Sequence, residues 1–376
     1  MQCDVDYEHR ARIAPNHTMT HVLNYALREV LGEGCDQRGS LVMAEKLRFD
    51  YASNNAPTPE QLGRIEAIVR EQIGRALPVF TKVVPLADAL AMNGLRAVFG
   101  ETYPDPVRVV SVGADVDSIL SEPAGAAWRG FSLELCGGTH IANTSRAQSF
   151  AIVSESSIAK GVRRIEGVTR DEATLAAGTA AQLEGDFAAA RAMSGAQLDA
   201  RIKELSEALS KVTISAHIKS RMRDEVAELS KRLLAEQKAA AALLVDACNG
   251  VALGALAAAR AAGKAAAVCD LPQLAGDGKV AQGVMKAVSG AEAGALSFLG
   301  VSADAADNKV LVFAVASKAA IAAGATAKDW VSAALAVAGG KGGGRDDGAQ
   351  GTAKGADKLA EILAAATAWG AAKGLL

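Results

Sequence analysis

The spacing of apolar residues near the start of the chain predicts two amphipathic helices. In residues 17–31, apolar side chains recur at the three- and four-residue steps of one helix face, at Val22, Leu23, Ala26, Leu27 and Val30. Asn16 precedes this run and is its predicted N-cap. A second helix is predicted over residues 59–77, because the letters TPE mark its start and Pro78 its end.

Apolar runs rich in β-branched residues predict strands between and after these helices. The runs are residues 40–51, 78–85, 107–113 and 149–156. Turn-forming residues flank them, as is typical of strands in a sheet. We therefore expect residues 1–170 to form a mixed α/β domain, in which helices pack on a sheet.

The next segment, residues 171–246, carries two apolar stripes that resemble those of a coiled coil. Each steps by three and four residues, and together they comprise Leu198, Ile202, Leu205, Leu209 and Val212, then Ile218, Met222, Val226, Leu229 and Leu233. The two stripes are out of phase, and the letters between them favour a helix only weakly. This pattern predicts a helical hairpin linker with a bend near residues 212–217.

Residues 247–376 are rich in alanine and glycine and predict a small α/β domain. Its strand candidates are residues 251–257, 264–271 and 309–316, with helical stretches between them. The segment GGKGGGRDDGAQG, at 339–351, lacks the GxxxxGK[ST] spacing of a P-loop. The fold class predicted for the whole chain is α+β.

Composition restricts the class of protein further. Of 376 residues, 50% are hydrophobic but only 4% aromatic, and the net charge is −2. That charge excludes a globally basic nucleic-acid binder but not a local basic surface. The five cysteines are odd in number and scattered, which favours a reducing compartment over a disulfide framework. No secretory signal and no charge-free run of about 18 apolar residues is found, so we expect a soluble protein without a membrane span.

Two pairs of metal-binding residue types share the same spacing. His17 and His21 lie four apart in the first predicted helix, which places both imidazoles on one face. Cys136 and His140 lie four apart around two glycines, which we expect to let the backbone turn tightly. Together these pairs offer the number and kind of ligands that zinc prefers.

The chemistry at such a site stays open from the residues alone. A metalloprotease helix would carry glutamate where this chain has Thr18, so peptidase activity is not expected. Four protein ligands usually close a structural zinc site, whereas catalytic zinc keeps one position open. Zinc could therefore be structural or catalytic.

At this point the motifs resemble a known family. NHTMTH and CGGTH, with ADALAMNGLRAVFGETYPDPVRVVSVG between them and IAKGVRRIEGVT after them, resemble the editing domain of alanyl-tRNA synthetases, which freestanding AlaX proteins share. GGKGGGRDDGAQG resembles the C-terminal domain of the same synthetases, a domain also appended to DHH phosphoesterases. The predicted hairpin occupies the place of the family's linker.

The resemblance implies an aminoacyl-tRNA deacylase that hydrolyses Ser-tRNA(Ala), and Gly-tRNA(Ala) as a further substrate, while sparing Ala-tRNA(Ala). It implies zinc on the four ligands, with a metal-held water attacking or orienting at the ester. Gly137 and Gly138 would let the ester carbonyl approach backbone N–H groups. Thr18 or Thr20 would contact the serine hydroxyl or merely support the helix cap. Gln37 would line the pocket wall or be a simple turn residue.

The resemblance also implies contacts with tRNA(Ala). Lys160, Arg163 and Arg164 form a basic cluster that would meet the phosphate backbone, the alternative being a solvated strand end. Lys341 and Arg345 would reach RNA from a flexible glycine-rich loop. Many family members carry proline at the position of Asp346, so this loop is expected to be less rigid and, through the added negative charge, to hold RNA less well.

Several readings of the whole chain stay open. The aminoacylation domain of a complete synthetase and the small glycine-motif barrel are not in the sequence, so ATP-dependent charging by this chain is not expected. The chain could be a freestanding editing hydrolase, a synthetase fragment that contributes editing and tRNA binding to alanine charging, or a non-catalytic tRNA-binding module with structural zinc. A homodimer through the helical or C-terminal region is compatible with the sequence. The expected compartment is the cytoplasm, with an organelle not excluded.

Overall fold

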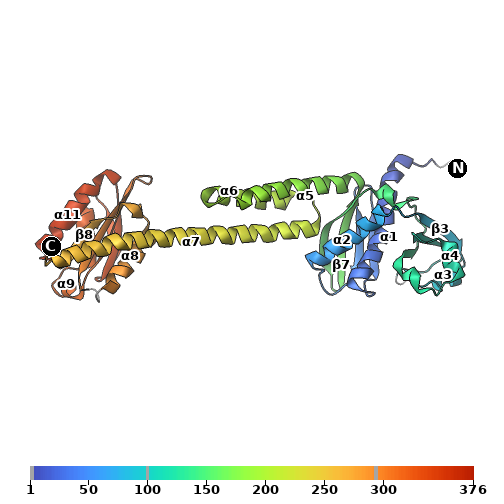
Figure 1. The fold of residues 1–376 in the computed structure, drawn as a ribbon, viewed down its shortest axis with the longest axis horizontal. Coiled ribbons are helices and arrows are strands. Elements are labelled where there is room, and N and C mark those ends of the chain that lie inside the picture. The colour runs from blue at the N-terminus through green and yellow to red at the C-terminus, as the bar shows by residue number, and fades with distance from the viewer. Residues whose placement is uncertain (1–3, 99–100, 292–294) are drawn as a thin grey trace. The chain divides into compact units, whose positions relative to one another are not determined.

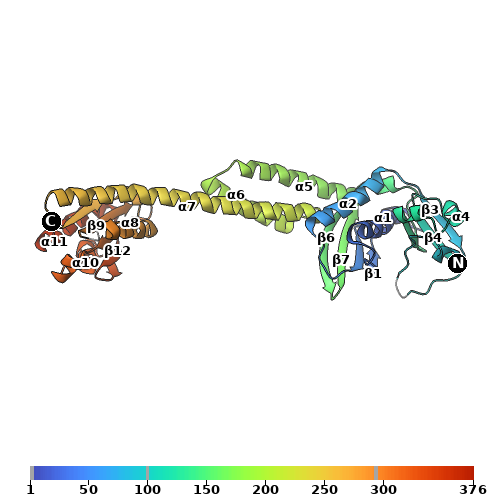
Figure 2. The ribbon, with the colours of Figure 1, turned by 60° about the horizontal axis from the view of Figure 1, so that its bottom comes forward.

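The computed structural model describes residues 4–98, 101–291 and 295–376 (Figures 1 and 2). The chain divides into two compact units, Met1–Leu233 and Leu234–Leu376. Helix α7, Ala216–Ala261, begins in the first unit and ends in the second. Each unit has its own hydrophobic core and is described by itself.

Helix α1 spans Tyr7–Leu31 and begins ten residues before the predicted start. Its N-cap is Asp6, whose carboxylate accepts the backbone N–H of His9, so the predicted N-cap at Asn16 is wrong. Asn16 is instead buried within the helix, where its amide donates to the carbonyl oxygens of Met43 and Ala44. The first ten residues of α1 were not predicted because Pro15, which lies inside the helix, is a common signal of a helix start.

Helices α1 and α2 pack on a four-stranded antiparallel sheet of order β1-β2-β7-β6. The predicted strand at 40–51 is in fact a hairpin of two strands, and β7 was not predicted. Helix α2 begins with a capping box of Thr58 and Gln61, which confirms the predicted start. The elements are β1 Gln37–Val42, β2 Leu47–Ala52, α2 Pro59–Gly74, β6 Phe150–Ala159 and β7 Val162–Thr169.

A second antiparallel sheet, of order β3-β4-β5, completes this part of the first unit. Its first two strands confirm the predictions at 78–85 and 107–113, whereas the short β5 was missed. Short helices α3 and α4 contribute to the same core. The elements are β3 Val79–Val84, α3 Leu86–Leu90, β4 Val107–Val112, α4 Val116–Ser121, η1 Ala126–Gly130, β5 Ser132–Leu135 and η2 Thr144–Ala147.

Three helices, rather than the two of the predicted hairpin, follow the sheets: α5 Arg170–Arg191, α6 Gly195–Lys211 and the first part of α7. Apart from Val212, which follows α6, the two apolar stripes lie on α6 and α7, and they pack with α5 around Phe187. The predicted bend is confirmed, since residues 212–215 separate α6 from α7. The division of the chain at residues 170 and 246 stays a prediction.

The second unit has a five-stranded sheet of order β11-β12-β10-β9-β8, in which only the β8–β9 pair is parallel. Strand β10 is buried on both faces: Val310, Val312 and Ala314 share a core with α10 and α11. Leu311, Phe313 and Val315 share the other core with α7 and α8. The elements are β8 Ala266–Asp270, η3 Pro272–Leu274, α8 Gly278–Gly290, β9 Ser297–Asp304, β10 Lys309–Val315, α9 Lys318–Ala322, α10 Ala327–Ala336, β11 Lys341–Gly344, β12 Gly348–Lys354, η5 Ala356–Lys358 and α11 Leu359–Ala372.

Two strand predictions in this unit are confirmed and one is wrong. Strands β8 and β10 match the runs at 264–271 and 309–316. Residues 251–257 belong to α7, where Ala252 and Leu256 are buried at helical spacing against α8 and the sheet. Alanine is the strongest helix former, and the alanine-rich flanks extend the helix through this short apolar run.

The glycine-rich segment is a β-hairpin and not the predicted flexible loop, because β11 and β12 pair within it. Glycine is required where the strands approach closely. A Cβ at Gly351 would lie 2.4 Å from Cα of Gly342, whereas one at Gly343 would meet nothing within 4 Å. The glycines therefore serve strand packing at specific positions.

Helix α7 is long and apolar enough, by length and composition alone, to cross a membrane. Its most apolar stretch has a mean hydropathy of 1.7, and 17% of that stretch is buried in the protein. The expectation that the chain has no membrane span rested on the lack of a charge-free apolar run and stays a prediction. The high value reflects alanine, and the same helix supplies Cys248, Ala252 and Leu256 to the core of the second unit.

Candidate metal centre

Four side chains converge in the first unit as the two sequence pairs predict. His17, His21, Cys136 and His140 each direct one ligand atom into a group whose members all lie within 4.8 Å of one another. The two pairs come from helix α1 and from the turn that follows β5. His21 is buried and the other three are half-buried. The cluster can hold a metal ion.

Backbone contacts fix the CGGTH turn against the neighbouring strand. The N–H of Cys136 donates to the carbonyl oxygen of Arg108 on β4, at 3.1 Å. The Arg108 guanidinium in turn donates to the carbonyl oxygen of Gly138. Arg108 of strand β4 therefore holds the turn at its first and its middle residue, and so helps to present Cys136 and His140 to helix α1.

Each histidine has one ring nitrogen held by the protein. Nδ1 of His17 lies 3.2 Å from the carbonyl oxygen of Thr139, and Nδ1 of His140 lies 3.1 Å from Oγ1 of Thr18. Nε2 of His21 lies 3.5 Å from Oε2 of Glu134. A carbonyl or carboxylate acceptor fixes the proton on the nitrogen that faces it, which leaves the other nitrogen free to bind a metal.

The remaining ring nitrogens behave as metal ligands would. Nδ1 of His21 and Nε2 of His140 are buried, and neither has a hydrogen-bond partner among the described residues. Nε2 of His17 lies 3.4 Å from Sγ of Cys136. Buried polar atoms without partners are costly, and a bound cation would satisfy them together. The residues therefore fit a metal ion with nitrogen and sulfur preference.

The electrostatics of the cluster favour uncharged imidazoles. Burial lowers the pKa of all three histidines, that of His140 to about 3. Burial also raises the pKa of the Cys136 thiol, which the N–H of Gly138 opposes by donating to Sγ at 3.4 Å. Neutral imidazole is the form that binds metal, and a cation in the cluster would favour the thiolate.

Glu134 and Asn24 form a buried layer behind the ligands. Nδ2 of Asn24 donates to Oε1 of Glu134 at 2.8 Å, while Oε2 faces His21. Burial raises the pKa of Glu134 to about 8, although the Asn24 hydrogen bond opposes the rise. Neither residue was predicted from the sequence. The available signals were a charged residue within the apolar strand SLEL and an asparagine three positions after His21.

The two glycines of CGGTH have different roles. A Cβ at Gly138 would lie 2.2 Å from Cε1 of His17, whereas one at Gly137 would meet nothing within 4 Å. Neither glycine has positive φ, so a left-handed backbone is not the reason for them. Gly138 is required by the close approach of the imidazole.

The other predicted substrate residues differ in what they contact, and Thr18 contacts the cluster through His140. The Thr18 hydroxyl is fully buried and engaged with Ala14, His140 and the N–H of Ile141. The Thr20 hydroxyl donates to the carbonyl oxygen of Asn16 in the same helix. Gln37 lies on β1, where its amide donates to Ser40. Their roles toward a substrate stay predictions.

The predicted RNA-binding cations are mostly paired with carboxylates. Arg163 binds Glu155 through two nitrogens, and Arg164 binds Asp50 in the same way. Arg345 is exposed but lies 3.3 Å from Asp347. Lys160, in the β6–β7 turn, and Lys341, on β11, are exposed. These pairs leave the arginines less available to phosphate than the sequence suggested.

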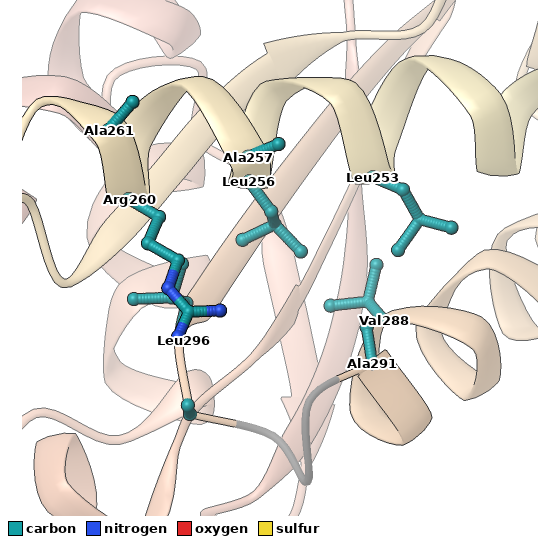
Figure 3. A pocket seen from close by; sticks show the side chains of 9 residues that line it. Leu253, Leu256, Ala257, Arg260, Ala261, Val288, Ala291 and Leu296 are labelled. Carbon is teal, nitrogen blue, oxygen red and sulfur yellow. The ribbon is translucent and has the colours of Figure 1, made fainter.

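The second unit contains a cavity of different chemistry. Figure 3 shows the side chains that line it, most of them on α7 and at the end of α8. Its volume is about 370 Å³. Its lining is apolar apart from Arg260, and comprises Leu253, Leu256, Ala257, Arg260, Ala261, Val288, Ala291, Ala295 and Leu296. The convergent polar groups lie in the first unit, which is therefore the candidate site.

Comparison with known families gives three matches in chain order. Residues 107–166 match the threonyl and alanyl tRNA synthetase second additional domain. Residues 173–236 match the alanine–tRNA ligase domain, and residues 263–372 match the DHHA1 domain. The first match includes Cys136 and His140. It identifies a domain that is found in aminoacyl-tRNA synthetases.

Three curated relatives of the chain are alanine–tRNA ligases, which are one kind of aminoacyl-tRNA synthetase. The chain is 45% identical over 241 residues to the cytoplasmic alanine–tRNA ligase of Dictyostelium discoideum, covering 63% of the chain and 26% of the relative. It is 35% identical over 352 residues to the cytoplasmic enzyme of Drosophila melanogaster, covering 91% of the chain and 36% of the relative. A mitochondrial relative from Saccharomyces cerevisiae is 45% identical over 223 residues, covering 59% of the chain and 23% of the relative.

The chain belongs to the alanyl-tRNA synthetase family and corresponds to the C-terminal portion of those enzymes. It spans about a quarter to a third of the length of the curated relatives that it matches.

Proposed function

We propose that the first unit is a zinc-dependent deacylase that hydrolyses the ester of mischarged tRNA(Ala). Its substrate would be Ser-tRNA(Ala), with Gly-tRNA(Ala) as a second, and Ala-tRNA(Ala) would be spared. The observation that carries this proposal is the convergence of four metal-ligating atoms within 4.8 Å, in a chain of the alanyl-tRNA synthetase family.

A separate hydrolytic site answers a physical problem of amino-acid selection. A pocket that accepts alanine cannot strongly reject glycine, which is smaller, or serine, which adds one hydroxyl. The usual solution is a second site that hydrolyses the wrongly charged tRNA, because binding at one pocket gives only a modest selectivity between such similar amino acids.

The residues of the cluster have distinct tasks in this proposal. His17, His21, Cys136 and His140 hold the zinc ion. When bound, zinc supplies a Lewis acid that polarises an ester carbonyl or a water. Thr18 holds the ring of His140, and Glu134 holds that of His21. The N–H of Gly138 donates to Sγ of Cys136 and so supports the sulfur ligand. The approach of an ester carbonyl to backbone N–H groups at Gly137 and Gly138 stays a prediction.

The same four donors favour a second candidate, a tRNA-binding module with structural zinc, because four protein ligands complete a tetrahedral shell. In either case we propose tRNA(Ala) as the partner. Relatives carry the names of cytoplasmic and mitochondrial enzymes, so the compartment is proposed as cytoplasm or organelle. A contribution to alanine charging within a longer synthetase and a homodimer stay predictions.

The decisive experiment compares deacylation of Ser-tRNA(Ala) and Ala-tRNA(Ala) by the purified 376-residue chain, with zinc content measured on the same sample. We expect the protein to contain one zinc ion per chain and to release serine from Ser-tRNA(Ala) while leaving Ala-tRNA(Ala) intact. Cys136→Ala should abolish deacylation and leave tRNA binding mostly intact. Cys35→Ala, which removes a buried thiol elsewhere in the same unit, is the matched control. Zinc and tRNA binding without turnover would support the structural-zinc alternative.

A further inference from the structure

A cavity in the first unit adjoins the metal cluster. It has a volume of about 460 Å³ and shares His140 with the four-ligand group. One wall is a face of helix α1, where Tyr7, Arg10, Ala11, Ala14 and Pro15 recur at helical spacing. The opposite wall contains Ile141, Arg146, Gln148 and Arg170. The cavity therefore adjoins one of the candidate ligand residues.

The charge in this cavity is of one sign. Apart from His140, the charged side chains among the described residues that line it are three arginines, Arg10, Arg146 and Arg170. They come from three elements: helix α1, the short helix η2 and the first residue of α5. Arginines that converge from separate elements are suited to a phosphate, whose oxygens accept several N–H groups at once.

The Arg170 guanidinium is held by one hydrogen bond and has a further buried N–H donor. Pro15 has no N–H, so the carbonyl oxygen of Ala11 lacks its usual helical partner, and Nη1 of Arg170 donates to it at 3.0 Å. Nε of the same guanidinium is buried and has no hydrogen-bond partner among the described residues. A buried donor without a partner is the kind of group that a ligand satisfies.

The backbone around the cavity is strained. Gln148 and Arg170 both line it and both have positive φ, 60° and 52°, without being glycine. Such conformations cost free energy and collect at binding sites, where the surrounding structure enforces them. The mouth also carries an exposed aromatic ring, since Tyr7 is 73% exposed and the Arg10 guanidinium lies 5.8 Å from its centroid.

We infer that this cavity binds the phosphodiester backbone of the single-stranded 3′ end of RNA, next to the ester that the metal cluster would receive. This inference rests on the proposed function. Arg10 lies seven residues before His17 on α1, about 10.5 Å along the helix axis. An RNA whose 3′-terminal ribose lies at the cluster must place the phosphates on the 5′ side of that ribose close by, and Tyr7 offers a face on which a base can stack.

The test is a salt titration of RNA binding by the full chain. The probe is an RNA hairpin without an attached amino acid that carries the acceptor stem and single-stranded 3′ end of tRNA(Ala). Its binding is measured by fluorescence anisotropy. Arg10→Ala, Arg146→Ala and Arg170→Ala are each expected to weaken binding on the order of threefold. Each should reduce the slope of log affinity against log salt by roughly 0.7, the value for one phosphate on a single strand.

Arg12→Ala is the matched control. Arg12 is exposed on the same helix, pairs with Glu45 and does not line the cavity. Arg10→Lys and Arg146→Lys keep the charge and should retain the salt slope of the unmodified chain. If the three alanine variants give the same slope as Arg12→Ala, the inference is wrong.

The two proposals fail in distinguishable ways. Deacylation of Ser-tRNA(Ala) with an unchanged salt slope in the variants would overturn the phosphate cavity alone. Arginine-dependent binding of the RNA 3′ end without any deacylation would overturn the deacylase and support the cavity. Where deacylation occurs, the variants should raise KM for the tRNA ester more than they lower kcat, because they act on binding of the RNA.

Discussion

The backbone of Gly138 lies directly against the imidazole of His17. A Cβ at position 138 would lie 2.2 Å from Cε1 and 2.8 Å from Nδ1 of that ring. The CGGTH turn and helix α1 therefore pack so closely at Gly138 that a side chain at this position would clash with His17. This contact decides the distance between the two halves of the metal cluster.

Gly138→Ala should weaken zinc binding and abolish deacylation, because the methyl group forces the turn away from His17. Gly137→Ala is the matched control, since a Cβ there meets nothing within 4 Å. Zinc affinity can be measured by competition with a chromogenic chelator. Equal affinities in the two variants would contradict the steric role of Gly138.

Glu134→Gln should weaken zinc binding by on the order of tenfold or more, as is typical when a group that orients a metal ligand is changed. Glu134 uses one oxygen to accept from Asn24 and directs the other at His21. Glutamine keeps the volume but replaces one oxygen by a donor, so one of the two contacts is lost. Chelator competition measures the change. Glu122→Gln, at an exposed position in the same unit, should have no effect on zinc affinity.

Thr18→Val should destabilise the first unit by about 1–3 kcal/mol, because the N–H of Ile141 loses its partner in the interior. It should also weaken zinc binding, since His140 loses its contact at Nδ1. Thr20→Val removes a hydroxyl whose one bond among the described residues is to Asn16 of the same helix, and a smaller loss of stability is expected. The loss of stability in each variant can be measured from the hydrogen exchange of the α1 amides at increasing denaturant concentration. A larger loss for Thr20→Val would be contrary to this assignment.

His217 should titrate below its ordinary pKa of 6.5, because burial disfavours the charged ring more than Glu66 favours it. The ring lies 2.7 Å from the Ser215 hydroxyl, which donates to Glu66, and Arg70 and Arg221 oppose its protonation. Since the fold favours neutral His217, its contribution to stability is present above pH 6.5 and is lost as the pH falls through the lowered pKa.

An NMR titration of the His217 ring measures this shift. Glu66→Gln should lower the pKa further, because it removes the neighbouring negative charge. Glu71→Gln changes an exposed residue of the same helix and is the control. A pKa at or above 6.5 in the unmodified chain would show that Glu66 dominates over burial.

Much of the local structure could be predicted from residue patterns. The apolar period of residues 17–31 lies in α1, and the continuous apolar run in residues 309–316 gives β10, buried on both faces. The same helical period placed His17 and His21 together, and the short spacing of Cys136 and His140 marked the second half of the cluster. These features depend on neighbours in sequence, so the sequence contains them directly.

The predictions failed where the outcome depended on distant contacts or on flanking residues. Asn16 looks like a helix cap in sequence, yet it is buried inside α1 because Asp6 starts the helix and Arg170 satisfies the carbonyl that Pro15 leaves free. Residues 251–257 have the composition of a strand, but the long α7 continues through them.

The sequence by itself determined the type of metal site that this protein can form, because four ligand residues at two helical spacings define its chemistry. Only the tertiary structure decided which groups support it. Glu134 meets Asn24 across 110 positions, His140 meets Thr18 across 122, and Arg163 and Arg164 are paired with carboxylates that local patterns do not indicate. Periodicity reports which face of an element is buried, whereas the partner that covers it is chosen when the whole chain packs.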